Sequence, residues 1–353
     1  MTADFERSIA GRRAFVTGHT GFTGGWLILW LKQLGCAVSG LALPPNTKPS
    51  LFKAARIDEG ITSEFGDIRD FAVVKAAVDR ADPELVIHLA AQPLVSVSFD
   101  DPIETIATNA LGTAHVLEAS RVAPNVKAVV CITTDKVYAD EADIRPHREE
   151  DRLGGKDPYS ASKAAAEIIA MSYATTLAAR GNGCRIATAR GGNIIGGGDW
   201  SRDRIVPDFV RAVAASTELT LRRPNAVRPW QHVLALVHGY LALADYLLRG
   251  GQSGSAWNFG PDISEAVTVE ELVRKLAASW TIPELHVVPA DFPETNVLRV
   301  DSHKARAELG WNPPLDIDRT IELTGAWYRA FYNDADSARA TTLAQIEEYR
   351  ALL

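Results

Sequence analysis

The sequence has no excess of basic residues. Its 353 residues include 37 Lys and Arg against 44 Asp and Glu, and the formal net charge is -7. A domain that binds nucleic acid usually presents a basic face, and here charges of both signs are mixed along the chain. We therefore expect no nucleic-acid partner.

Long apolar runs and paired cysteines are also missing. The apolar stretches are far shorter than the ~20 residues that span a bilayer, and the opening "MTADFERSIAGRRAFVTG" has no apolar core of a signal peptide. The three cysteines, Cys36, Cys131 and Cys184, are widely spaced and odd in number, which favours reduced thiols over disulfides or a zinc site. We expect a cytoplasmic protein with no membrane partner and no metal.

Apolar runs alternate with helical patterns over roughly the first 190 residues. Fully apolar strands separated by helices predict a parallel sheet covered on both faces, the doubly wound α/β fold of Rossmann type. The expected strands are 13–17, 37–43, 63–66, 85–90, 128–133 and 184–189, and the expected helices include 26–34, 71–79, 102–121 and 160–179.

The pattern loosens from about residue 191 into Gly-rich and Arg-rich loops around helices such as 232–248. No repeat or linker separates an independent domain. We expect a Rossmann domain over residues 1–190, and over 191–353 a smaller mixed α/β lobe that binds substrate, with some segments returning to the Rossmann domain.

A glycine-rich turn follows the first expected strand. In "TGHTGFTG", Gly18, Gly21 and Gly24 stand where the backbone can approach a pyrophosphate and a helix N-terminus can supply amide donors. The alternative is a tight turn that needs positive φ. The second strand ends in "SGLALPPNTKPS" without the usual acidic ribose ligand, so this region leaves the choice between NAD and NADP open.

A tyrosine and a lysine lie one helical turn apart in "DPYSASKAAAE". Tyr159 and Lys163 share a helix face, so the ammonium can stabilise a phenolate and make the tyrosine a general base. The alternative is an amphipathic surface helix. The strand before them ends in "TTDKVY" with Thr134, and the order of the three motifs is more informative than any one of them.

These motifs give the chain a clear resemblance to extended short-chain dehydrogenases/reductases that modify nucleotide sugars, and most of all to the CDP-glucose 4,6-dehydratases. The similarity runs from about residue 13 to about residue 313. The segments that carry it are "FVTGHTGFTGGWL", "PSLFKAAR", "GDIRD", "HLAAQPLV", "TNALGTAHVLEA", "TTDKVY", "GGKDPYSASK", "GGNIIGGGDW", "DRIVPD", "RPWQHV" and "WNFGP".

The resemblance implies NAD as cofactor and a nucleotide sugar as substrate. Thr134, Tyr159 and Lys163 would carry out hydride transfer, Asp67 and Ile68 would hold the adenine, and Ala90 and Asn109 would line the cofactor cleft. The full cofactor set that we expect is Gly18, Thr20, Gly21, Phe22, Thr23, Gly24, Asp67, Ile68, Leu89, Ala90, Ala91, Asn109, Tyr159 and Lys163.

Dehydration needs two further groups. After C4 of the hexose is oxidised, a base must remove the C5 proton and an acid must protonate the departing C6 hydroxyl. The resemblance implies Asp135 as the acid and Lys136 as the base. At their ordinary pKa values, ~3.9 for Asp and ~10.4 for Lys, the aspartate would lack a proton to give and the lysine would be unable to accept one. The site must therefore raise the first pKa and lower the second. The alternative is a surface ion pair at a strand end.

An anionic substrate must enter a protein of net negative charge, and local arginines can meet its phosphates. By resemblance, Gln92 and Asn193 would contact sugar or diphosphate, and Arg204 and Arg228 the diphosphate. Trp230, Gln231 and His232 of "RPWQHV" would contact the nucleoside. His232 could equally be a core histidine.

Residues 139–155 depart from the family, because they lack the aromatic residues expected before their "RE" pair, with His147 in place of Tyr. This leaves the identity of base and hexose open. Two other functions remain possible: a 4-epimerase, which would leave Asp135 and Lys136 without a role, and a non-catalytic NAD-sensing regulator. Apolar residues on several faces of helices 102–121 and 160–179 predict a homodimer or homotetramer.

Overall fold

The computed structural model describes residues 4–139, 145–180, 183–261, 266–278, 280, 283–288 and 299–353. Its centre is a seven-stranded sheet in the order β11-β6-β5-β4-β1-β2-β3, and every strand pairing in it is parallel. The strands are β1 (Arg13–Thr17), β2 (Ala37–Ala42), β3 (Thr62–Phe65), β4 (Leu85–His88), β5 (Ala128–Ile132), β6 (Arg185–Gly191) and β11 (Ser255–Phe259).

The predicted fold class is confirmed, and the six strands expected from sequence lie within a few residues of their predicted bounds. After β3 the chain crosses back to place β4 on the other side of β1. Ligands of doubly wound sheets bind outside the carboxyl ends of the strands at such a reversal. The expected site motifs follow β1, β4 and β5, so the topology brings them together at one edge of the sheet.

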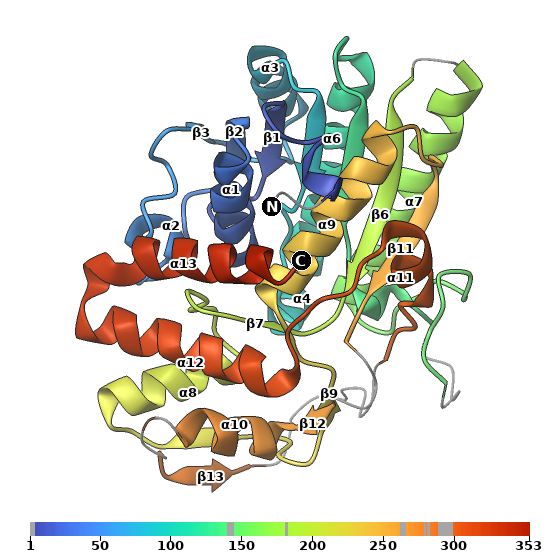
Figure 1. The fold of residues 1–353 in the computed structure, drawn as a ribbon. Helices are drawn as coiled ribbons and strands as arrows, with labels where there is room; N and C mark the ends of the chain where they lie inside the picture. Colours follow the sequence, from blue (N-terminus) through green and yellow to red (C-terminus); the bar gives the residue numbers. More distant parts are fainter. Residues whose placement is uncertain are drawn as a thin grey trace.

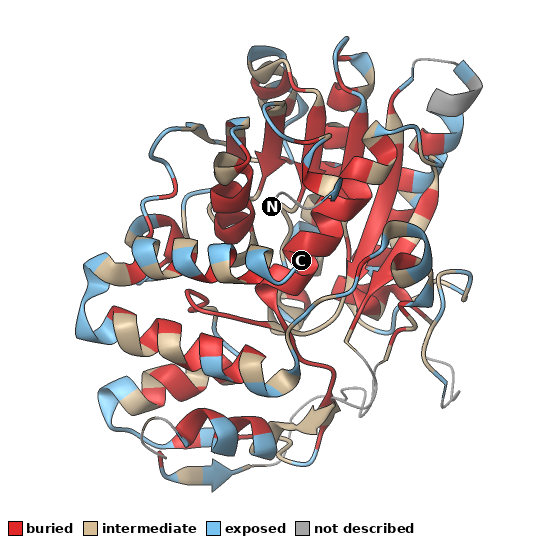
Figure 2. Cartoon of the chain, in the orientation of Figure 1, coloured by how far each residue is buried: buried red, intermediate tan, exposed pale blue. Residues whose placement is uncertain are grey.

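Helices cover both faces of the sheet, and the buried residues concentrate between these layers (Figures 1 and 2). One face carries α3 (Phe71–Ala81), α6 (Gly112–Val122) and α7 (Pro158–Arg180), which pack in sequence beside one another. The other face carries α1 (Phe22–Gln33) and α9 (Val233–Leu248). The apolar residues between each helical layer and the sheet form two separate core clusters.

The helix expected over residues 102–121 is interrupted. It consists of α5 (Pro102–Ile106), a π-helical segment η2 (Ala107–Leu111) and α6. Such single-turn π segments are frequent at functional sites. This one places Asn109 inside the protein, where the side chain is almost fully buried.

A smaller lobe lies below the sheet in Figure 1. It contains α8 (Ile205–Ala215), α10 (Val269–Ala277), α12 (Ile317–Asn333) and two short strand pairs: β8 (Leu219–Leu221) with β13 (Leu285–Val287), and β9 (Val227–Arg228) with β12 (Val267–Thr268). Although they follow residue 190, α9 and β11 pack on the large sheet, where β11 pairs with β6.

The remaining elements are short connections and a C-terminal helix that crosses α1. They are η1 (Asp4–Glu6), α2 (Leu51–Ala54), α4 (Val95–Asp100), η3 (Asp135–Val137), β7 (Ile194–Ile195), β10 (Gln231–His232), α11 (His303–Leu309), η5 (Ala335–Ser337) and α13 (Ala338–Ala351). Among the described residues, no helix combines the length and the apolar character needed to cross a membrane.

Candidate active site

The glycine-rich turn joins β1 to α1 and has little room for side chains. Gly18 has φ +79°, and a Cβ on it would lie 2.7 Å from the Ala90 nitrogen. A Cβ on Gly24 would lie 2.2 Å from the Gly18 oxygen. Both glycines are therefore required by the fold itself: Gly18 packs against the residues after β4, and Gly24 packs against the backbone of Gly18 and His19.

Gly21 differs from these two glycines. It is the N-cap of α1 with φ -80° and ψ 171°, ordinary extended backbone, and no side chain caps the helix. A Cβ on Gly21 would meet only the Gly18 oxygen, at 3.4 Å. The exposed N-terminus of α1 thus keeps open space beside amide donors, the arrangement that binds phosphate groups.

Several side chains around this turn contact other parts of the protein. The Thr20 hydroxyl donates to the Leu43 carbonyl oxygen (2.9 Å), just beyond β2, and Phe22 packs against the core. Thr23 is half-buried. No acidic residue directly follows β2, and the contact between Thr20 of the glycine-rich turn and Leu43 is a hydrogen bond between uncharged groups.

Asp67 and Ile68 follow β3. The Asp67 carboxylate accepts from Arg69 Nε with both oxygens (3.1 and 2.9 Å) and from Arg69 Nη2 (2.6 Å), and this guanidinium lowers the pKa of Asp67. Ile68 is buried, and its carbonyl oxygen lies 2.9 Å from Nδ1 of His115. That these two residues hold an adenine stays a prediction.

The loop after β4 is held by Asn109. Its Oδ1 accepts from the Gln92 backbone nitrogen (2.8 Å), and its Nδ2 donates to the Gln92 carbonyl (3.1 Å) and to Ser162 Oγ (2.9 Å). The Gln92 side chain bonds to Leu94 and Thr105. Asn109 therefore joins the loop of Leu89, Ala90 and Ala91 to α7, and Gln92 braces that loop.

The turn after β5 brings together the residues predicted to perform chemistry. Thr134 is the N-cap of η3, and its hydroxyl accepts from the Lys136 nitrogen (3.3 Å) and lies 3.0 Å from Asp135 Oδ1. Asp135 is buried, which raises the pKa of its carboxyl, although nearby Lys136 opposes the shift. A raised pKa keeps the carboxyl protonated at higher pH, as a proton donor requires.

Tyr159 and Lys163 project from the first turns of α7. This helix begins at Pro158, where the Asp157 carboxylate accepts from the Ser160 nitrogen (2.8 Å) as a cap. Lys163 Nζ donates to the Ile132 carbonyl oxygen (2.8 Å) at the end of β5. The helix and the strand end are thereby locked to each other.

Burial dominates the electrostatics of this pair. It lowers the pKa of Lys163 to about 8, opposed by the nearby Glu167 carboxylate. It raises the pKa of Tyr159 to about 12, opposed mainly by a hydrogen bond with Thr134. A cation beside the phenol would therefore be needed to make Tyr159 a base near neutral pH.

The predicted substrate residues lie between β6, α8, β9 and β10. The Asn193 carbonyl accepts from the Gln231 nitrogen (3.1 Å). Arg204, the N-cap of α8, pairs with Asp199 (3.2 Å), and Arg228 is buried in β9. The Trp230 indole nitrogen is buried and has no partner among the described residues.

Gln231 and His232 are both buried. Gln231 Nε2 donates to the Phe259 carbonyl (2.8 Å). The His232 ring accepts from the Leu234 nitrogen as the cap of α9 and stands edge-on to Trp26 at 5.7 Å. Burial lowers the pKa of His232 to about 3, so it is neutral. The other ring nitrogen, Nε2, is buried without a partner among the described residues, so a contact between His232 and the nucleoside stays a prediction.

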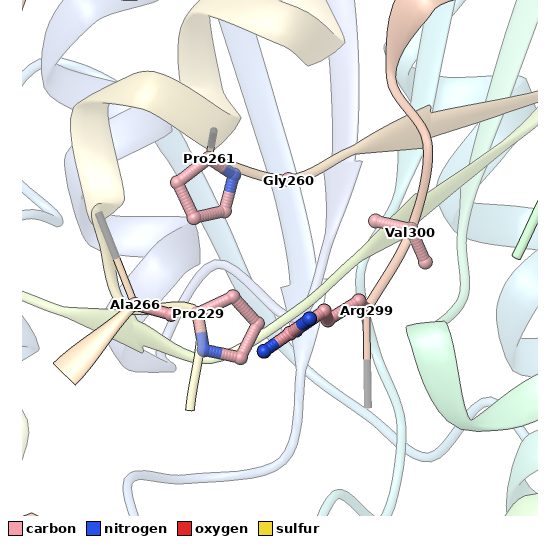
Figure 3. A pocket seen from close by; sticks show the side chains of 6 residues that line it. All are labelled: Pro229, Gly260, Pro261, Ala266, Arg299 and Val300. Atoms are coloured by element: carbon pink, nitrogen blue, oxygen red, sulfur yellow. The ribbon is translucent and has the colours of Figure 1, made fainter. Parts of the chain in front are cut away.

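Arg299 was not expected from sequence. Its side chain extends toward Pro229 in a small cavity with Gly260, Pro261, Ala266 and Val300 (Figure 3). The buried Arg299 Nε has no partner within the described part of the chain. No sequence motif marks this arginine, because only the fold brings it beside the "RPWQHV" segment.

Comparison with known proteins agrees with this geometry. A family model described as GDP-mannose 4,6 dehydratase matches residues 15–324. The chain belongs to this family. Within it, the CDP-glucose 4,6-dehydratase of Salmonella typhimurium is 41% identical over 333 residues, which cover 92% of this chain and 93% of the relative.

Solved structures of the same architecture include a dehydratase and an epimerase. The dTDP-glucose 4,6-dehydratase DesIV from Streptomyces venezuelae, with NAD bound, is 25% identical with a TM-score of 0.75, covering 90% of this chain and 96% of that one. The UDP-glucose 4-epimerase of Thermus thermophilus, also with NAD, is 26% identical with a TM-score of 0.76, covering 90% and 98%.

Membership of the GDP-mannose 4,6-dehydratase family confirms the resemblance predicted from the motifs. The matched residues include the glycine-rich turn, the η3 turn, the start of α7 and Arg299. The match ends within α12, so α13 lies beyond it.

Proposed function

We propose that the protein is an NAD-dependent hydro-lyase that dehydrates a nucleoside-diphosphate hexose at C4–C6, with CDP-glucose as the substrate. The observation that carries the proposal is the η3 turn. It holds a buried acid, Asp135, and a lysine, Lys136, next to the Thr134 hydroxyl that also hydrogen-bonds Tyr159. The relative at 41% identity is named for this reaction.

The glycine-rich turn fits NAD. Gly18 and Gly24 keep the turn tight, and Gly21 leaves open space at the uncapped N-terminus of α1 for a pyrophosphate. When bound, NAD would accept a hydride from the substrate and return it later in the same turnover.

The residues of α7 and the η3 turn would move the protons. Tyr159 takes the proton of the C4 hydroxyl, directly beside Thr134, while the Lys163 ammonium stabilises the phenolate. Lys136 then removes the C5 proton, which the new C4 ketone makes acidic. Asp135, whose pKa is raised by burial, gives its proton to the departing C6 hydroxyl.

Because the Thr134 hydroxyl donates to Asp135 Oδ1 (3.0 Å), the proton that Asp135 gives to the leaving hydroxyl would sit on Oδ2. Arg204, Arg228 and Arg299 are proposed to meet the diphosphate, with Asn193 near the sugar and Trp230 near the base. Gln92, whose side chain bonds to Leu94 and Thr105, would act mainly by shaping the site, and His232 is proposed to lie near the base with Trp230.

The 4-epimerase is the second candidate, because the epimerase structure shares the fold. It needs Thr134, Tyr159 and Lys163 but neither a proton donor at Asp135 nor a second base. Incubating the purified protein separately with CDP-glucose, UDP-glucose, dTDP-glucose and GDP-mannose and weighing the products separates the two. A product lighter by one water from CDP-glucose supports the proposal, whereas unchanged mass with an altered sugar supports the epimerase.

We also propose a homodimer or a dimer of dimers. Large apolar side chains are exposed along α5, η2 and α7, namely Ile103, Ile106, Leu111, Ile168 and Met171. Elements α5, η2 and α7 contact one another, so this surface is continuous. Light scattering at micromolar concentration should give at least twice the 38.2 kDa chain mass, and a particle of that mass would contradict the assembly.

A further inference from the structure

A buried ion pair lies directly behind the η3 turn. Glu167 follows Lys163 by one helical turn on α7, and its carboxylate accepts from Arg190 Nε (3.1 Å) and Nη2 (3.0 Å) on β6. It also accepts from the hydroxyls of Thr133 (2.5 Å) and Thr188 (2.6 Å). The Glu167 side chain is fully buried, so these four hydrogen bonds satisfy it without water.

The other end of Arg190 reaches Tyr138. Arg190 Nη1 donates to the Tyr138 phenol oxygen (2.8 Å), and the phenol donates to Asn258 Oδ1 on β11 (2.6 Å). The Tyr138 ring stacks on His147 with centroids 4.6 Å apart, and the Arg190 guanidinium lies over the same ring at 4.9 Å. The unusual His147 thus packs behind the turn.

The two residues that join this network flank the turn. Thr133 immediately precedes Thr134, and Tyr138 follows Val137, the last residue of η3. Val137 and Tyr138 also form a small core cluster of their own with Ala164 and Val300. One ion pair therefore anchors the entrance and the exit of the segment that carries Asp135 and Lys136.

We propose that Thr133 and Tyr138, linked through the Glu167–Arg190 pair, are positioning residues that hold Asp135 and Lys136 in place for the elimination of water. This inference rests on the proposed dehydration. It assigns a role to side chains that are not among the residues proposed to contact substrate or cofactor.

We expect the network to affect the elimination of water more than hydride transfer, because the residues for the two steps are held in place by different contacts. Tyr159 and Lys163 are held by α7 and by the Lys163 bond to Ile132, which precedes Thr133 in the chain. Asp135 and Lys136 lie in a short 3₁₀ turn, whose backbone bond from the Val137 nitrogen to the Thr134 oxygen is long (3.4 Å). Thr134 caps this turn, but its hydroxyl is also held by the hydrogen bond with Tyr159 on α7. A displacement of about 1 Å in such a turn can cost about 100-fold in rate.

Tyr138→Phe tests the exit of the turn. It keeps the ring on His147 and under the guanidinium, but removes the hydroxyl that accepts from Arg190 and donates to Asn258. Thr133→Val tests the entrance, since it keeps the shape and removes the hydroxyl that donates to Glu167. Tyr349→Phe is the matched control, because this buried phenol on α13 contacts His238 on α9 (3.2 Å) and belongs to a different core cluster.

With CDP-glucose, both network variants should still form bound NADH, seen by its absorbance, and the rate of this step should fall much less than the rate of elimination. Release of the 6-deoxy product should then fall by about 10- to 100-fold, with KM changed less than about twofold. NADH should accumulate in the variants and not in the unaltered protein. Tyr349→Phe should keep both rates, whatever its melting temperature.

A loss of NADH formation as large as the loss of product release, or no loss of either, would overturn the positioning role. If both network variants unfold at the assay temperature while Tyr349→Phe does not, the network is only a stabilising element and the inference is wrong. Failure of the proposed function gives a separate signal, because the unaltered protein would then neither reduce NAD with CDP-glucose nor release a dehydrated product.

Discussion

Replacing Asp135 by Asn should separate activity from stability. The amide keeps the volume of the carboxyl and an oxygen to accept from Thr134, and the cap of the η3 turn, the Thr134 oxygen that accepts from the Lys136 nitrogen, is unchanged. It cannot protonate a leaving hydroxyl. Loss of one general acid typically costs about 10²- to 10⁴-fold in rate, or about 3 to 5 kcal/mol in the barrier.

The same change should not weaken the fold. Burial raises the pKa of Asp135 in the folded protein, whereas in the unfolded chain the carboxyl titrates near ~3.9. The folded state holds this proton more tightly, so its contribution to stability is fully present below the unfolded pKa. It is lost as the pH rises toward the folded pKa. An amide has no such dependence.

Two assays on the Asp135→Asn variant check this reasoning. Mass spectrometry should show dehydration of CDP-glucose reduced by the range above, while thermal unfolding at pH 7 gives a melting temperature at or above that of the unaltered protein. The difference should shrink toward pH 4. Asp245→Asn, at a buried carboxylate on α9 that accepts from Ser8 (2.6 Å), is the control and should keep full activity. Near-normal dehydration by Asp135→Asn would refute Asp135 as the acid, and marked destabilisation would refute the electrostatic argument.

Three further predictions concern the other parts of the site. Lys136→Ala should still reduce bound NAD when CDP-glucose is added but lose about 10²- to 10⁴-fold in dehydration; near-normal dehydration measured by product mass would require another base for C5. Gly21→Val should abolish NAD binding in calorimetry while circular dichroism shows a folded chain, because φ at Gly21 is ordinary and a Cβ there meets little of the protein; unchanged NAD affinity would place the pyrophosphate elsewhere. The rate of substrate-dependent NAD reduction should fall as the pH rises through about 8, because Lys163 then loses its ammonium charge. The titratable groups that act on Lys163 are Glu167 and Cys131. A rate that stays constant up to pH 10 would contradict a role for that charge.

The sequence predicted the parts of the fold that depend on local patterns. Apolar runs separated by amphipathic helices marked six strands of the sheet, and the motifs after β1 and β5 marked the site. The seventh strand, β11, was not predicted, because pairing with β6 through a long crossover is a tertiary event. The π segment η2 was hidden inside a helical pattern that continues on both sides of it.

The candidate site was predicted where its residues are close in sequence and missed where they are not. Thr134, Asp135 and Lys136 are consecutive, and Tyr159 and Lys163 share a helix face. Arg299 lies beside Pro229 only through folding. Likewise, the contacts of Tyr138 with Arg190 and Asn258 join segments far apart in the chain. Local sequence patterns do not predict contacts between such distant segments.

The most direct test of dehydration follows one hydrogen. CDP-glucose deuterated at C4 should give a product lighter by one water that carries the deuterium at C6, and the same reaction in deuterated water should place solvent deuterium at C5. This result requires oxidation at C4, elimination across C5 and C6, and return of the same hydride. A product of unchanged mass with deuterium still at C4, or a dehydrated product without label at C6, would contradict the account.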